Sequence, residues 1–205
     1  MDFSKHGFTV DLLSSFVLVV RNFFLLTFFP YKAMRKIAEG KDYWQIGIIF
    51  SLVFIYFKFA YFLRDKPYPA TFIFFVFLLH FFLSVFFFYF LSSIAKKNLK
   101  ISSFIFTFSY ALLPTLIWFS TTSVLFIVLP PPRTFSLTGG AFTIFFTAYS
   151  LSLLAWKVIL VYLAIRFSTK LNFYRVVYLM ILYFAWFIPY SVLLYYNRIF
   201  RIPFI

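Results

Sequence analysis

The sequence predicts an all-α membrane protein, a bundle of five transmembrane helices preceded by amphipathic interfacial helices. Composition gives the first reason: 64% of the 205 residues are hydrophobic, 27% are aromatic and 12% are charged. A soluble domain is about half apolar and about a quarter charged, and a fold of this size could not bury so many large apolar side chains. The second reason is that the apolar residues form continuous runs, without the alternation of a membrane β-barrel.

Five apolar stretches are long enough to cross about 30 Å of hydrocarbon as helices. We expect these spans at residues 46–63, 71–95, 104–129, 143–165 and 176–194, so the membrane domain covers residues 46–194. Residues 1–45 then form an N-terminal amphipathic, interfacial segment, and residues 195–205 form a C-terminal tail. Asp42 and Gln45 have the spacing of a capping box at the start of the first span.

The loop cations predict the orientation of the chain in a cell membrane. With the N-terminus in the cytoplasm and the C-terminus outside, 12 Lys and Arg residues lie inside and five lie outside, in agreement with the positive-inside rule. The inside residues are Lys5, Arg21, Lys32, Arg35, Lys36, Lys41, Lys96, Lys97, Lys100, Arg166, Lys170 and Arg175, and the outside residues are Arg64, Lys66, Arg133, Arg198 and Arg201.

The net charge of +14 restricts the partners. Nucleic-acid binding needs cations gathered on one soluble face, whereas here they form short clusters between apolar runs. We therefore expect no nucleic acid as a partner. We expect anionic lipid headgroups at the cytoplasmic face and other membrane protein subunits, with a homo-oligomer as the alternative to a mixed complex.

Residues 11–29 allow two interpretations. On a helix, Asp11, Ser14, Ser15, Arg21 and Asn22 share about a third of the circumference, as expected for a helix that lies among the headgroups. The segment could instead be a sixth span with Arg21 inside the membrane, at a cost of about 3 kcal/mol. We favour the interfacial helix.

A second short amphipathic helix is expected directly after this segment. In the run YKAMRKIAEG, Met34, Ile37 and Ala38 lie opposite the charged side chains, and Gly40 ends the helix.

Two segments resemble the Yip-domain family, the Ypt/Rab-interacting membrane proteins and their prokaryotic relatives. The run FFPYKAMRKIAEGKDYW, leading into a span, resembles the entry to that domain. The run SYALLPTLIW resembles its most recognisable element, a small residue, Tyr, three apolar residues and Pro in the third span, here Ser109, Tyr110 and Pro114. The resemblance covers residues 28–194 and implies five spans with a cytoplasmic N-terminus.

The sequence departs from the family pattern in two respects. Ser109 stands where the family often has Gly, and the long N-terminal region of the eukaryotic members, with its Asp-bearing motif, is missing. We therefore expect a prokaryotic-type relative that does not bind small GTPases.

Lys58 and His80 lie within expected spans and each has two interpretations. Lys58 is within two helical turns of Arg64, so its stem can reach the outer headgroups; a contact with a solute or a lipid phosphate is the alternative. His80 could relay protons, or it could form a hydrogen bond to a Ser, Thr or Tyr of a neighbouring helix.

Lys157 is the cation that we expect to lie deepest in the membrane. It lies about nine residues from Arg166, roughly 13 Å along a helix, which is too far to snorkel completely. Because the expected spans contain no Asp or Glu, the ammonium should meet a water-filled cavity, backbone carbonyls, an anionic lipid or the acid of a partner subunit. Lys157 can have a structural or a functional role. We expect its ammonium to meet an acidic group from a partner subunit or a lipid.

Two prolines interrupt expected spans. Pro114 should free the carbonyl of Tyr110 and bend the third span, either as a packing kink or as the wall of a cavity or a hinge. Pro189 should bend the fifth span in the same way.

We expect no enzymatic activity, no metal and no cofactor. The sequence has no H-E-x-x-H or G-x-S-x-G motif, no paired intramembrane aspartates and no Gly-rich phosphate loop, and it has no cysteine and two histidines. The first hypothesis is a scaffold or interaction subunit within an assembly. The alternative is a small transport component in which Lys157, His80 and Pro114 line a path for an anionic or amphipathic solute or lipid. A dry interior around Lys157 would favour the scaffold, and a polar pocket open to one side would favour transport.

Overall fold

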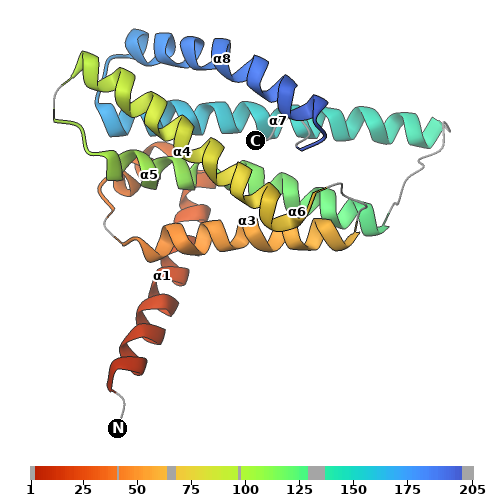
Figure 1. The fold of residues 1–205 in the computed structure, drawn as a ribbon, viewed down its shortest axis with the longest axis horizontal. Helices are drawn as coiled ribbons and strands as arrows, with labels where there is room; N and C mark the ends of the chain where they lie inside the picture. Colours follow the sequence, from red (N-terminus) through yellow and green to blue (C-terminus); the bar gives the residue numbers. More distant parts are fainter. Residues whose placement is uncertain (1–2, 41, 64–67, 97, 129–136, 200–205) are drawn as a thin grey trace.

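The computed structural model describes residues 3–40, 42–63, 68–96, 98–128 and 137–199, and the regular secondary structure of these residues is entirely α-helical (Figure 1). The loop residues Lys41, Arg64, Lys66, Lys97 and Arg133, the span end Leu129 and the tail residue Arg201 lie outside the described residues. The helices are α1 (Phe3–Phe28), α2 (Pro30–Ile37), α3 (Trp44–Leu63), α4 (Ala70–Ala95), α5 (Ile101–Tyr110), α6 (Leu113–Val128), α7 (Leu137–Thr169) and α8 (Phe173–Tyr196).

Within the described residues, six helical segments are long and apolar enough to cross a membrane. They are Thr9–Phe28, Trp44–Leu63, Ala70–Ala95, Ile101–Val128, Gly140–Thr169 and Phe173–Tyr196. The all-helical prediction is confirmed, and each of the five expected spans coincides with one of these segments to within a few residues. The sixth segment, Thr9–Phe28, is the one for which the sequence left two interpretations.

The middle of the bundle is formed by α5 and α6, which follow one another along its length (Figure 1). α3, α4 and α7 pack against this pair, and α8 packs against α4 and α7. The side chains of Phe104, Phe106 and Phe108 are buried, and Phe108 packs against Phe88 of α4 with ring centroids 5.3 Å apart. Burial of this aromatic core explains why α5 and α6 together are more buried than any other candidate span in the described part of the chain.

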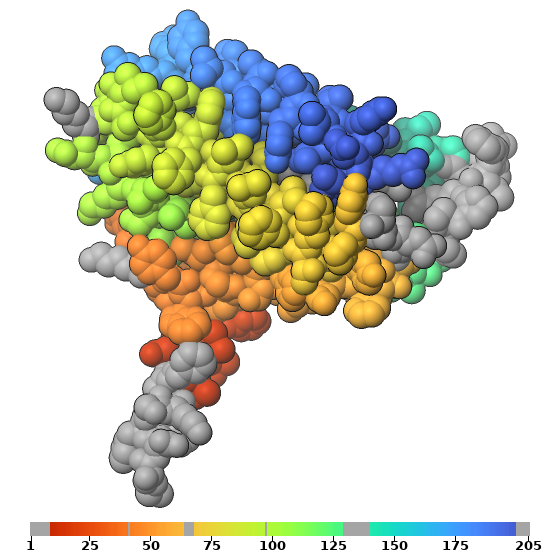
Figure 2. Space-filling model, viewed as in Figure 1, coloured from red at the N-terminus to blue at the C-terminus, as the bar shows by residue number. Residues whose placement is uncertain are grey.

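The outer face of the bundle is apolar as well. α4 and α8 form much of the surface seen in Figure 2. Phe75 and Phe86 of α4 and Ile181 and Ile188 of α8 are exposed. Such a surface would promote aggregation in water, but lipid tails are as apolar as these side chains. The exposed apolar side chains therefore suit contact with lipid.

The third expected span is broken rather than bent. α5 ends at Tyr110 and α6 begins at Leu113, so the two residues between them form a turn. Pro114 lies in the first turn of α6, where its missing N–H breaks no hydrogen bond within the helix. In contrast, α8 continues through Pro189.

α2 is the predicted amphipathic helix. It starts at a proline, buries Ala33, Met34 and Ile37 and exposes its basic side chains. It ends at Ile37, three residues before the expected end at Gly40. A Cβ atom at Gly40 would lie 3.0 Å from the Ile37 carbonyl oxygen and 3.2 Å from the Phe106 ring, so the close approach of the chain to α2 and α5 favours glycine.

α1 runs across the direction of α3, and its N-terminal half projects from the bundle (Figure 1). The polar stripe that we expected to face the headgroups is divided. Asp11, Ser14 and Arg21 are exposed, whereas Ser15 and Asn22, about two turns apart, are buried against the bundle. Part of the stripe therefore contacts protein, which corrects the prediction.

A chain of hydrogen bonds fastens α1 to the bundle. Ser15 Oγ donates to Asp42 Oδ2 (2.6 Å), and Gln45 Nε2 donates to the same oxygen (3.1 Å). The Tyr110 hydroxyl donates to Gln45 Oε1 and accepts from Asn22 Nδ2 (3.1 Å). The chain therefore begins and ends on α1 and passes through the start of α3 and the end of α5.

The carboxylate of Asp42 also caps α3. Its Oδ1 accepts a hydrogen bond from the backbone N–H of Trp44 (3.1 Å), which is one of the amides that an α-helix leaves without a partner. The predicted capping role of Asp42 is confirmed, but Gln45 bonds to the Asp42 carboxylate and not to its backbone N–H.

Tyr110→Phe should lower the free energy of unfolding by about 2 kcal/mol, because it leaves the buried Gln45 and Asn22 side chains each without one partner. The measurement is thermal unfolding of the purified protein in detergent micelles. Tyr178→Phe is the control, since Tyr178 on α8 is 71% exposed. Equal melting temperatures for the two variants would contradict the role of the Tyr110 hydroxyl.

Candidate functional site

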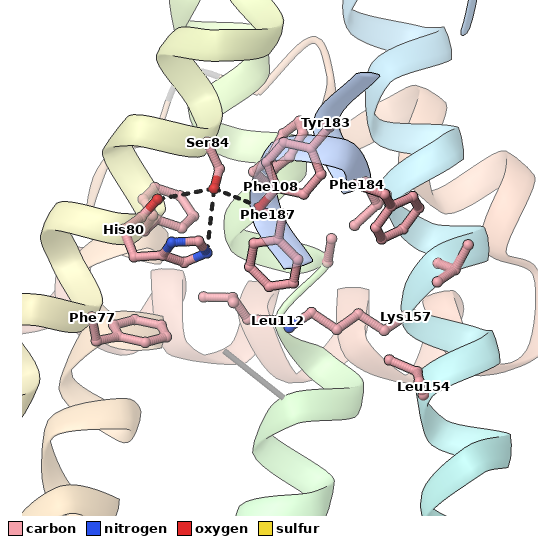
Figure 3. A pocket seen from close by; sticks show the side chains of 14 residues that line it. Phe77, His80, Ser84, Phe108, Leu112, Leu154, Lys157, Tyr183, Phe184 and Phe187 are labelled. Carbon is pink, nitrogen blue, oxygen red and sulfur yellow. Dashed lines mark hydrogen bonds between the residues drawn. The ribbon is translucent and has the colours of Figure 1, made fainter. Parts of the chain in front are cut away.

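A cavity of about 90 Å³ lies inside the bundle, beside the break between α5 and α6 (Figure 3). Side chains of α4, α5, α7 and α8 and the two residues of the break line it. Four of the lining residues carry polar side chains: His80 and Ser84 from α4, Lys157 from α7 and Tyr183 from α8. The cavity thus brings together two of the residues that the sequence singled out, His80 and Lys157.

His80 and Ser84 are buried on one face of α4, one turn apart. Ser84 Oγ donates to the His80 carbonyl oxygen (2.9 Å), lies 2.8 Å from the Tyr183 hydroxyl and lies 3.4 Å from His80 Nε2. Because a serine hydroxyl has one hydrogen to donate, a bond from Ser84 to the His80 carbonyl leaves the Tyr183 hydroxyl as the donor to Ser84. The sequence predicted a hydroxyl partner on a neighbouring helix; the direct partner of His80 is on its own helix, and Tyr183 is reached through it.

The other ring nitrogen of His80 faces a different environment. Nδ1 is buried and has no hydrogen-bond partner among the described residues. The ring stacks on Tyr190, with centroids 5.3 Å apart, and its centroid lies 5.2 Å from that of Phe187. A buried polar atom without a partner costs free energy, so the site favours a water molecule or a ligand that can bond to this nitrogen.

Lys157 is half-buried, and its side chain extends from α7 toward Leu112 at the break (Figure 3). The rest of the cavity wall there is apolar and includes Leu154, Phe184 and Phe187. A cation at this depth is costly in hydrocarbon and usually faces the interior of a bundle or a water-filled space. The cavity lies next to the break in the third span, because Ala111 and Leu112 of the turn line it together with Lys157.

The chemistry of the cavity is that of a small amphipathic site. Its walls are mostly aromatic and aliphatic, and its polar groups are a lysine ammonium, two hydroxyls and an imidazole. A space of this size holds a few water molecules or one small group of a larger ligand. An anionic or hydrogen-bonding group with an apolar remainder fits these surroundings best.

The other predicted site residues lie elsewhere. Lys58 is exposed on α3, and its Nζ lies 5.7 Å from the ring centroid of Phe54. Its stem therefore runs toward the start of α3, away from the expected direction toward Arg64. Ser109 and Tyr110 are fully buried at the end of α5, and Pro114 stands beside the break without lining the cavity.

Sequence reasoning missed Ser84 and Tyr183. Ser84 had a signal, since residues four apart lie on one face of a helix and His80 had already been singled out. Tyr183 had none, because the chain contains 15 tyrosines and several fall within spans. Asn22 and Ser15 had been noticed as part of a polar stripe, but their contacts with the bundle could not be read from the pattern.

In the part of the chain that the structure describes, no three His, Asp or Glu side chains come together in a way that could hold a metal ion. No family model matches the chain, and no match was found among curated proteins or solved structures. The likeness to the Yip-domain family accordingly stays a hypothesis.

Proposed function

We propose that this chain is a non-enzymatic membrane scaffold or interaction subunit of the Yip-domain type, working within an assembly. The observation that carries the proposal is the exposed face of α7. This helix has the smallest buried share of the candidate spans in the described residues, and its N-terminal end reaches beyond the ends of α3 and α8 (Figure 1).

The exposed face of α7 has a seven-residue pattern. Ala141, Ala148 and Ala155 are exposed at intervals of seven residues, and Ile144 and Leu151 are exposed three residues after the first two alanines. We call these five residues the α7 seam. Apolar residues repeating in this way form the contact stripe of helices that pair along their length.

The opposite face of α7 is already occupied. The Tyr149 hydroxyl lies 2.8 Å from Thr121 Oγ1, and Ser150 Oγ accepts from the Trp118 indole at 3.2 Å, so both residues hold α7 against α6. The seam therefore points away from the bundle. In lipid, helices associate through close packing, and small residues such as alanine allow their backbones to approach.

Ala148→Phe should remove the assembly while leaving the fold unchanged, because a bulky ring on the seam keeps a partner helix at a distance. The measurement is the particle mass in mild detergent, corrected for bound detergent, with mass spectrometry of every co-purifying protein. The control is Ala185→Phe, which adds the same ring to an exposed alanine of α8. We expect the wild type and the control to exceed the 24.5 kDa of one chain, and Ala148→Phe to fall to it.

A wild-type particle with the mass of one chain would overturn the proposal. Equal masses for the wild type and Ala148→Phe, both above that of one chain, would show that another surface makes the assembly.

We also propose five transmembrane spans, with α1 and α2 at the cytoplasmic interface of a cell membrane and the C-terminus outside. The direction of α1 across α3 supports an interfacial α1. The basic side chains of α2, of the loop between α4 and α5 and of the loop between α7 and α8 belong to one end of the bundle, which supports a cytoplasmic assignment for that end.

The depth of two labels tests the interfacial α1. Leu13 and Phe24 are exposed on one face of α1, eleven residues and about 16 Å apart along the helix. The chain has no cysteine, so Leu13→Cys and Phe24→Cys each introduce one labelling site. We expect quenching by spin-labelled lipids to place both fluorophores at the same depth.

The equivalent pair on α4, Phe75→Cys and Phe86→Cys, is the control, because these residues are also exposed and eleven apart within a candidate span. This pair should differ in depth by most of the 16 Å or so. A similar difference between the two α1 sites would make α1 a sixth span.

The cavity favours a second candidate function, a transport component for an anionic or amphipathic solute or lipid. The specific observation is that Lys157 and His80, whose buried Nδ1 has no hydrogen-bond partner among the described residues, line the same space inside the bundle. Intramembrane ionisable groups that face such a space commonly mark substrate paths.

Lys157→Met should weaken the binding of an anionic amphiphile such as oleate, with its carboxylate in the cavity, at least tenfold, since it removes the cation and keeps the apolar stem. Binding of fluorescent fatty acid to the protein in neutral micelles measures this. Lys58→Met is the matched control, because Lys58 is an exposed lysine of a span. If both variants bind like the wild type, the cavity has only a packing role.

A further inference from the structure

A larger hollow lies at the basic end of the bundle, where α4 ends, α5 begins, α7 ends and α2 lies across them. Its volume is about 700 Å³. Arg35 of α2, Lys96 and Lys100 of the loop between α4 and α5, and Lys170 after α7 all line it, and Glu39 is its one acidic lining residue in the described part of the chain. We call it the basic pocket; its lining has three more cations than carboxylates.

The floor of the basic pocket is polar and held by hydrogen bonds. Ser103 Oγ donates to Ser168 Oγ (3.3 Å), and Ser168 Oγ lies 2.9 Å from Thr107 Oγ1. Lys96 Nζ donates to the Thr169 carbonyl oxygen (3.1 Å). The serine and threonine bonds join α5 to the end of α7, and the Lys96 bond ties the end of α4 to the same place.

The chain bends sharply on two sides of this pocket. Asn98 has a φ of 66° and Lys170 a φ of 57°, a left-handed conformation that asparagine tolerates and lysine rarely adopts. The backbone N–H of Lys170 bonds to the Arg166 carbonyl oxygen (2.8 Å), which ends α7 and turns the chain at the pocket. The fold thus keeps a lysine in an unfavourable conformation at the wall of a cationic site.

The position of the basic pocket along the bundle indicates which part of the membrane surrounds it. Two candidate spans end there, at Ala95 and Thr169, and a third begins there at Ile101. Because the apolar spans occupy the hydrocarbon core, their ends lie among the lipid headgroups. A basic pocket between helix ends at this depth is a site type that binds lipid phosphates.

We infer that the basic pocket binds the phosphate headgroup of an anionic membrane lipid. Its volume lies in the range of ligand sites, about 300–1,000 Å³, and exceeds the space that one phosphate needs. Three excess cations suit a headgroup with more than one negative charge, such as a lipid with two phosphates. The hydroxyl of Ser102, which also lines the pocket, can donate a further hydrogen bond to a phosphate oxygen.

This site is separate from the cavity that contains Lys157 and from the α7 seam. None of the seam residues lines the pocket, and neither His80 nor Lys157 does. The lipid site can therefore be present whether or not the proposed assembly forms.

The test compares two double variants of the full chain in mild detergent. Arg35→Gln with Lys100→Gln removes two cations that line the pocket. Lys36→Gln with Arg175→Gln removes one Lys and one Arg that are exposed near the same end and do not line it. Native mass spectrometry then measures the binding of cardiolipin, which has two phosphates, against phosphatidylcholine, which has no net charge.

We expect the wild type and the surface variant to bind cardiolipin preferentially and the pocket variant to bind it about thirtyfold more weakly. Lys170→Asn is a milder second variant, because asparagine keeps the left-handed conformation without the charge; it should weaken binding about fivefold. If the double variant does not fold, Lys170→Asn still tests the basic pocket.

Three results would overturn the inference: equal loss in the pocket and surface variants, no loss in either, or equal binding of phosphatidylcholine and cardiolipin by the wild type. A separate titration with inorganic pyrophosphate distinguishes a lipid from a soluble ligand. If pyrophosphate binds the wild type as tightly as cardiolipin does, the lipid assignment is wrong and the pocket serves a soluble phosphate compound.

Discussion

The Tyr110 hydroxyl donates to Gln45 of α3 and accepts from Asn22 of α1, so one buried group joins three helices. Asp42 extends this contact to Ser15 and to the start of α3. In an apolar surrounding, hydrogen bonds between helices have no water to compete with them. The orientation of α1 across the bundle, the start of α3 and the end of α5 therefore depend on one connected set of polar side chains.

The break that follows Tyr110 lies beside the cavity inside the bundle. Ala111 and Leu112 of the turn line the cavity, which Lys157 lines from α7 and His80 from α4. Proline in the first turn of α6 costs no helical hydrogen bond, and the hydrogen bonds of Tyr110 hold the end of α5 in place. The same short segment thus connects the anchoring of α1 with the cavity.

Lysine and arginine side chains lie at two different depths along the bundle. Lys157 lies inside the bundle among aromatic side chains, and the basic pocket lies where the spans end. The two levels favour different ligands: the first fits a small polar group on an apolar body, and the second fits a phosphate headgroup. The α7 seam adds a surface for another helix, so the proposed scaffold would have lipid and protein contacts on different parts of its surface.

The sequence alone determined the membrane class, the approximate positions of the five expected spans and the amphipathic nature of α2, because hydropathy and helical periodicity depend on local residue order. It also singled out His80 and Lys157, since ionisable groups are rare and costly in apolar segments, and it singled out Tyr110 through the resemblance to the Yip-domain motif. Only the tertiary structure decided that Asn22 meets Tyr110, that Tyr183 reaches His80 through Ser84, that Pro114 marks a break and not a bend, and that Lys58 lies back over Phe54. These features depend on contacts between residues far apart in the chain or on rotamers set by packing, and no local pattern encodes them.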